Sequence, residues 1–123
     1  MKAILIDPYF EKIVEIEYSG DWRDINKLLQ CDIFTVVYMP DTTDSIFVDD
    51  EGLYVENQKY WKFAGCPQPL AGIGLVLGCN DEGDSVSCVS TLEQVKTMVE
   101  WCPDGTKVEP RFDIHNLIEF IGK

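Results

Sequence analysis

The sequence predicts an α+β fold, with a mixed or antiparallel sheet of about five strands and two or three helices packed on one face. Two observations carry this prediction. Strand-like and helix-like segments are mixed along the chain without the regular alternation of a βαβ protein. The 123 residues are 46% hydrophobic and 11% aromatic, which is enough to form one packed core. We therefore expect a single compact domain over residues 1–123.

The first predicted elements are a β-hairpin and a helix. The apolar run 2–6 indicates a buried strand, and 13–18 alternates apolar and acidic side chains as a half-buried strand does. A helix is predicted to begin at Gly20-Asp21, where Asp21 can cap it, and to end near Cys31. Its apolar stripe consists of Trp22, Ile25, Leu28 and Leu29.

The middle of the chain contains further strand-like runs at 33–39, 45–48 and 73–77. Turns and loops rich in Asp, Pro and Gly separate them, at 40–44, 49–52, 65–72 and 80–84. The segment 53–63 fits a strand and a helix equally well. Each proline of the 65–72 loop disfavours α conformation in the residue before it.

The last third is predicted to hold a short strand at 85–89 and two helices. The first helix opens at Ser90-Thr91, where Ser90 and Glu93 have the spacing of a capping box. Its apolar face is formed by Leu92, Val95, Val99 and Cys102. A final short helix is expected from Asp113, with Ile114, Leu117, Ile118 and Ile121 at helical spacing.

Charge is the most unusual property of this chain. It has 22 acidic and 10 basic side chains, a formal net charge of −12. Such a protein repels phosphates, which argues against direct binding of nucleic acid through a basic surface. No apolar run approaches the ~20 residues of a membrane helix, and no basic segment followed by an apolar one opens the chain. We expect a folded cytoplasmic protein without a membrane partner.

The residues that catalysis or metal binding would use are few. Five cysteines lack any C-x-x-C pair, and His115 is the single histidine, so we expect reduced thiols and neither a metal site nor a cofactor. An EF-hand needs glycine at loop position 6, where the two acidic turns would place Tyr54 and Ser85. Gly72-Ile-Gly74 has no Lys or Arg nearby to neutralise a phosphate. We therefore expect no enzyme and no catalytic residue.

Residues 42–84 carry eight acidic side chains against two lysines, a net charge of −6 for this stretch. Aromatic side chains lie among them, and acidic groups around aromatic rings can attract a basic protein surface. The alternative is that the aromatics form the core and the acids a solvated face. The residues that we expect to bind a partner are Asp49, Asp50, Glu51, Tyr54, Asp81, Glu82 and Asp84.

Several segments together resemble the family of small phage and mobile-element proteins catalogued as domain of unknown function 3846. They are 1–8, Gly20-Asp21, 47–53, 67–72 and 74–84. The resemblance covers about residues 1–100 and leaves 101–123 as a C-terminal extension with a short helix. It implies a phage or plasmid setting and brings no catalytic residues.

Two functional hypotheses follow. The first is a phage-encoded accessory protein that binds and modulates a basic host protein, for instance one that itself binds nucleic acid. DNA mimicry, in anti-defence or host takeover, is one form of that binding. The second is a small-ligand protein, such as a sponge for a nucleotide signal. Its binding residues would be Asn57, Tyr60, Trp61 and Gln68. An unpaired edge strand at 45–48 would also allow a homo-oligomer.

Overall fold

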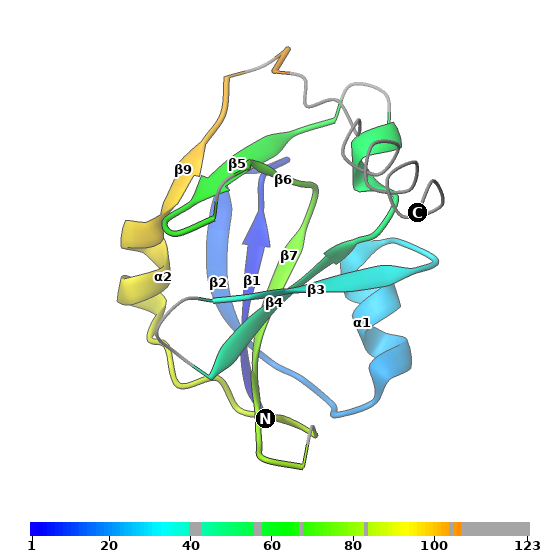
Figure 1. Ribbon diagram of the computed structural model, residues 1–123, viewed down its shortest axis with the longest axis vertical. Helices are drawn as coiled ribbons and strands as arrows, with labels where there is room; N and C mark the ends of the chain where they lie inside the picture. Colours follow the sequence, from blue (N-terminus) through cyan, green and yellow to red (C-terminus); the bar gives the residue numbers. More distant parts are fainter. Residues whose placement is uncertain (40–42, 56–57, 67, 83, 104, 107–123) are drawn as a thin grey trace, which may run out of the picture.

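The computed structural model describes residues 1–39, 43–55, 58–66, 68–82, 84–103 and 105–106. Within them the predicted α+β class is confirmed: a six-stranded antiparallel sheet, a small three-stranded sheet and two α-helices (Figure 1). The helix predicted from Asp113 lies outside the described residues. No helix in the described part is long and apolar enough to cross a membrane.

The large sheet has the strand order β2-β1-β7-β4-β3, with β8 paired to β7 beside this path. Its members are β1 (Lys2–Asp7), β2 (Lys12–Glu17), β3 (Phe34–Tyr38), β4 (Asp44–Asp49), β7 (Gly74–Cys79) and β8 (Ser85–Val86). The predicted N-terminal hairpin is confirmed by the β1–β2 register, which pairs Ala3 with Ile16. The expectation that 45–48 is an unpaired edge was wrong, because β4 pairs with both β3 and β7. The edge on that side is β3.

The small sheet is assembled from β5 (Tyr60–Phe63), β6 (Leu70–Ala71) and β9 (Val99–Trp101), in the order β6-β5-β9. The ambiguous segment 53–63 therefore divides into a strand and the 3-10 helix η1 (Gly52–Tyr54). The helix predicted to reach Cys102 was too long, since Val99 and Trp101 pair with Phe63 and Trp61 of β5. Local apolar spacing predicted a helix there, and pairing with a distant strand decided otherwise.

Both α-helices begin at capped residues. In α1 (Trp22–Leu29), the Asp21 carboxylate accepts a hydrogen bond from the Arg23 N–H at 3.0 Å, as the sequence predicted. In α2 (Leu92–Met98), the capping box is formed by Thr91 and Gln94, one residue later than predicted. Ser90 is not the cap because it is buried, and its N–H donates to the Asp44 carboxylate at 2.8 Å.

Alternate side chains of the large sheet form two core clusters. On one face, Ile4, Ile46 and Val76 pack with Trp61 of β5 and Val95 of α2. On the other face, the cluster consists of Ala3, Tyr18, Ile73, Leu75 and Leu77 with Ile25 and Leu29 of α1. The helices were predicted on one face, whereas the structure divides them between the two, and Figure 1 shows them on opposite sides of the molecule. Both faces of the sheet are covered because both faces are apolar.

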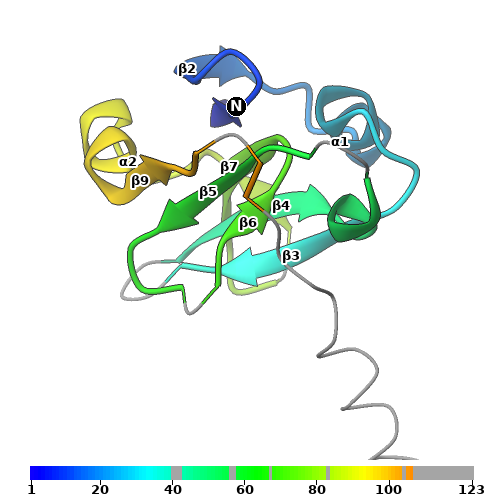
Figure 2. The same cartoon turned by 90° about the horizontal axis from the view of Figure 1, so that it is seen from above.

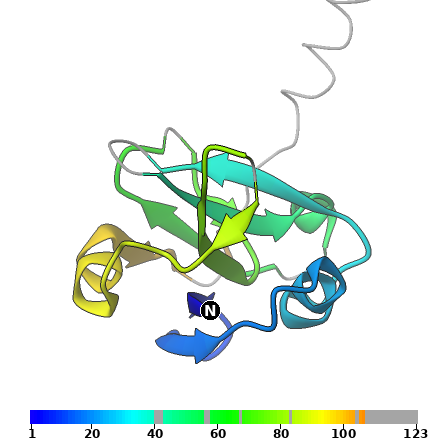
Figure 3. The ribbon, with the colours of Figure 1, turned by 90° about the horizontal axis from the view of Figure 1, so that it is seen from below.

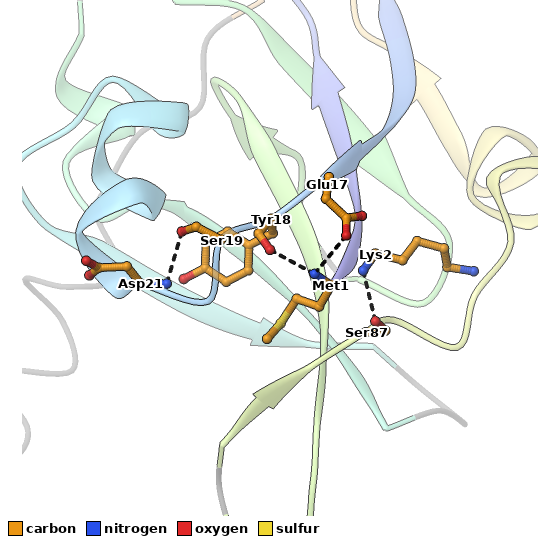
Figure 4. A network of polar contacts seen from close by, with 7 residues as sticks. All are labelled: Met1, Lys2, Glu17, Tyr18, Ser19, Asp21 and Ser87. Atoms are coloured by element: carbon orange, nitrogen blue, oxygen red, sulfur yellow. Dashed lines mark hydrogen bonds and ion pairs between the residues drawn. The ribbon is translucent and has the colours of Figure 1, made fainter.

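Polar contacts fix the start of β1 between two other segments (Figure 4). The Met1 amino group donates to the Tyr18 carbonyl at 2.8 Å and lies 3.3 Å from the Glu17 carboxylate. The Lys2 N–H donates to Ser87 Oγ at 2.8 Å. The Met1 contacts close the β1–β2 hairpin, and the Lys2–Ser87 hydrogen bond joins it to the segment that leads into α2.

Candidate functional site

An open hollow of about 580 Å³ lies where the end of α1 meets the turn after β4. We call it the acidic hollow. In Figures 1 and 3, η1 lies beside α1 at this place. Its lining residues are Asn26, Lys27, Gln30, Cys31, Asp32, Asp49, Glu51, Tyr54 and Val55. The carboxylates of Asp32, Asp49 and Glu51 and the Tyr54 ring thus face a shared space. Asp49, Glu51 and Tyr54 are among the residues predicted from the sequence, whereas Asp32 is not, and the predicted Asp50 does not line the hollow.

Backbone and side-chain hydrogen bonds hold this turn in place. The Asp49 carboxylate accepts from the Glu51 N–H at 2.9 Å, and the Asp50 N–H donates to the Ile33 carbonyl at 2.9 Å. The buried Gln58 side chain donates to the Gly52 carbonyl at 2.8 Å. Gly52 packs closely against the small sheet, and a Cβ on it would make a tight contact of 3.2 Å with Ala71. The carboxylates are therefore presented from a supported turn.

Carboxylates outnumber basic side chains in the lining of the acidic hollow. Lys27, the basic residue of its wall, lies 3.6 Å from the Asp24 carboxylate on the same helix. Burial, together with the charges of Asp49 and Asp32, raises the pKa of the Cys31 thiol to about 11. Burial and then Asp49 and Asp7 also raise the pKa of Tyr9. Negative charge thus disfavours further anions at this surface and favours a cation.

The groups that would meet a partner are accessible. Asp50 and Glu51 are exposed, Asp49 is half-buried, and Tyr54 is 62% exposed. An exposed aromatic ring beside carboxylates can receive a guanidinium or ammonium group on its face while the carboxylates pair with it. The chemistry that this geometry suits is recognition of Lys or Arg side chains.

The second predicted acidic turn lies at the opposite end of the strand pair. Asp44 pairs with Gly78 and Val48 with Gly74, so β4 separates Asp81, Glu82 and Asp84 from Asp49. A six-residue strand spans about 17 Å. Between the turns, 45–48 and 74–78 contain no charged side chain. The predicted partner-binding residues therefore form two separate groups.

The described residues of the small-ligand hypothesis are not brought together around one cavity. Trp61 and Tyr60 are buried, and the Trp61 indole N–H donates to the Gly72 carbonyl at 2.7 Å. Gln68 lines a different hollow of about 610 Å³ between β5 and α2. Asn57 lies outside the described residues. The buried aromatics belong to the core, which was the alternative that the sequence left open for this stretch.

The cysteines are free thiols in the described structure, with Cys88 buried and the other four half-buried. No group of three or more His, Cys, Asp or Glu side chains that could hold a metal ion occurs among the described residues. The sequence reasoning missed the wall that α1 contributes to the acidic hollow. Asp32, directly after that helix, was the available signal, but its proximity to Asp49 depends on the β3–β4 pairing.

Fold and site together define a small α+β domain with an acidic, partly aromatic surface hollow. The chain belongs to the family described as domain of unknown function (DUF3846), which matches residues 1–100. This range contains both α-helices and the whole acidic hollow. Neither a curated protein nor a solved structure matches the chain.

Proposed function

We propose that this protein is a small acidic accessory protein that binds and modulates a basic host protein through the acidic hollow. The observation that carries the proposal is the grouping of Asp32, Asp49 and Glu51 around the exposed Tyr54. The lysine of the same wall already lies beside Asp24, so the three carboxylates exceed the local positive charge. The phage or mobile-element setting that the family resemblance implies supports a host protein as the target.

In the proposed complex, a Lys or Arg side chain of the partner enters the hollow. Its charged group pairs with the Asp49 and Glu51 carboxylates, and its flat or apolar part packs on Tyr54. The net charge of −12 steers a basic surface toward the protein from a distance. Specificity then comes from the local contact, since long-range attraction acts on any basic surface.

DNA mimicry is the less supported form of this binding. A B-DNA duplex carries one charge per about 1.7 Å of its axis. Between the two acidic turns, in contrast, 45–48 and 74–78 carry none. Because the two acidic turns are separated, they favour one local contact over a continuous stripe of negative charge. We therefore place the binding site in the acidic hollow, which the first turn lines.

The test compares two double variants with the same change in charge. Asp49→Asn with Glu51→Gln alters the hollow, while Asp81→Asn with Glu82→Gln alters the distant turn. Wild-type protein used as bait in a host lysate should capture a basic protein that moderate salt releases. Its affinity, measured by calorimetry with the purified partner, should fall about tenfold or more in the hollow variant alone.

Other outcomes would contradict the proposal. Equal weakening in both double variants would mean that overall charge, and not the hollow, drives binding. Capture that is indifferent to salt would exclude an electrostatic contact. Tyr54→Ala provides a second check, because it keeps every charge and removes only the exposed ring.

A further inference from the structure

Among the residues that the structure describes, strand β3 forms one border of the large sheet and pairs with β4 on one side only (Figure 2). Its sequence, Phe34-Thr-Val-Val-Tyr38, contains neither charge nor proline. The opposite border, β2, carries Lys12, Glu15 and Glu17. Proteins protect free strand edges with charges, prolines or bulges, and an unprotected apolar edge is a site where another strand pairs. The β2 border of this sheet is therefore protected by charged side chains, and the β3 border is not.

The β3–β4 pairing determines which backbone groups of β3 face outward. The Asp50 N–H donates to the Ile33 carbonyl, and the Met39 N–H donates to the Asp44 carbonyl, at 2.9 and 3.2 Å. In an antiparallel ladder, residues alternate between facing the neighbour and facing away from it. The odd-numbered residues of β3 therefore bond to β4. The N–H and C=O groups of Phe34, Val36 and Tyr38 point to the open side.

The side chains of these three residues lie on one face of the sheet and line an apolar hollow of about 300 Å³, together with Trp22 and Phe47. Tyr38 is 78% exposed and Trp22 59%. No charged side chain lines this hollow within the described part of the chain. An uncharged aromatic surface is unusual on a chain with a net charge of −12.

We propose that β3 pairs with β3 of a second copy of this chain, antiparallel and across a two-fold axis at Val36. Val36 then lies opposite Val36 of the second copy, and Phe34 lies opposite Tyr38 of the second copy. The six outward N–H and C=O groups of each strand all find partners in this register. The two apolar hollows also meet on the same face, because a two-fold axis normal to the sheet preserves its faces.

Charge favours a second copy over the basic partner of the acidic hollow at this edge. The β3 surface offers no carboxylate to a cation, whereas an identical neutral strand matches it. Antiparallel pairing also separates the acidic turns, since Asp49 lies beside Phe34 and thus next to the Tyr38 end of the other strand. Along the strands the two Asp49 residues would be about 14 Å apart, beyond the screening length of about 8 Å at physiological salt.

Sedimentation equilibrium of the full chain over a range of concentrations tests the proposal, with Val36→Lys as the main variant. This substitution places two lysines opposite each other at the axis, and we expect the dimer dissociation constant to rise at least about tenfold. Val14→Lys on the other border is the matched control, with the same change in net charge, and it should leave the dimer intact. Since each lysine lowers the net negative charge, long-range repulsion cannot explain a loss of the dimer.

Amide hydrogen exchange adds a measurement specific to the edge. Protection of the Phe34, Val36 and Tyr38 amides should increase with protein concentration, while the Thr35 and Val37 amides, already bonded to β4, should not change. If Val36→Lys unfolds, Tyr38→Lys at the exposed end of the strand replaces it. A wild-type monomer at all concentrations would overturn the proposal, as would a dimer that survives both lysine variants or unchanged protection at the three amides.

Discussion

Trp61 explains a pair of glycines that looked like part of a phosphate loop in the sequence. The carbonyl of Gly72, a residue with φ of +75°, accepts the indole hydrogen bond. A Cβ on Gly74 would lie 2.7 Å from the Trp61 ring. Gly74 thus makes room for the buried indole, and Gly72 supplies the carbonyl that accepts its hydrogen bond.

Cys31 lies in the wall of the acidic hollow, where burial first, and then the charges of Asp49 and Asp32, raise the pKa of its thiol. Its raised pKa, about 11, should make it react slowly with iodoacetamide at pH 9, because alkylation requires the thiolate. Asp49→Asn removes one cause of the shift and should increase the rate, which peptide mass spectrometry measures. Glu82→Gln, on the distant turn, is the control that should leave the rate unchanged.

The same thiol links stability to pH, and this is part of the same prediction. The pKa of this thiol is higher in the folded chain than in the unfolded chain, so its protonated form stabilises the fold. This stabilisation is complete below about pH 9 and is lost as the pH rises toward 11. The free energy of unfolding should therefore decrease over this range by less in Cys31→Ser than in wild type. Equal pH dependence in the two proteins would contradict the assignment.

At the scale of elements, the two helices differ in how well their starts could be predicted. Asp21 caps α1 as expected, whereas in α2 the cap shifts from Ser90 to Thr91. Both Ser90-Thr91-Leu92-Glu93 and Thr91-Leu92-Glu93-Gln94 have a capping-box pattern, so local sequence does not separate them. The carboxylate of Asp44, buried beside the segment, decides between them by accepting the Val89 and Ser90 N–H groups.

This cap leads to a stability prediction. Thr91→Ala should lower the free energy of unfolding by about 1 kcal/mol, because it removes the hydroxyl that accepts from the Gln94 N–H. Glu93→Ala should lower the free energy of unfolding much less, because Glu93 is exposed and is not part of the observed capping box. Urea denaturation of both variants measures the difference. A larger effect from Glu93→Ala would support the box predicted from sequence.

At the scale of the whole molecule, unbalanced charge is the dominant property. Ion pairs among the described residues, such as Arg23 with Asp21 and Lys62 with Glu100, lie at the surface, where such pairs contribute little to stability. With a net charge of −12, the folded chain repels itself. Compactness therefore depends on the two apolar core clusters on either side of the large sheet.

Salt should consequently stabilise the protein. Raising sodium chloride from about 10 mM to about 150 mM shortens the screening length from about 30 to about 8 Å. We expect the thermal unfolding midpoint, measured by circular dichroism, to increase. Salt should raise the unfolding midpoint by less in a variant with four fewer negative charges, which combines Asp49→Asn, Glu51→Gln, Asp81→Asn and Glu82→Gln. A midpoint that falls or does not change with salt would contradict self-repulsion as a destabilising term.

Patterns among neighbouring residues were sufficient to predict the local features of this protein. Alternation and apolar runs predicted the N-terminal hairpin, the segments of β3, β4 and β7, and the start of α1, because these patterns depend on neighbouring residues. The acidic turn that contributes Asp49, Glu51 and Tyr54 to the hollow could be predicted for the same reason. The excess of negative charge needed only the composition.

Features that depend on contacts between distant residues could not be predicted from these local patterns. Pairing with β5 turned Val99 and Trp101 from a helix end into a strand, and the place of β4 between β3 and β7 moved the free edge to β3. The same pairing set the two acidic turns at opposite ends of the sheet. Contacts between residues far apart in the chain choose among local patterns of nearly equal energy, and the sequence pattern alone does not rank those contacts.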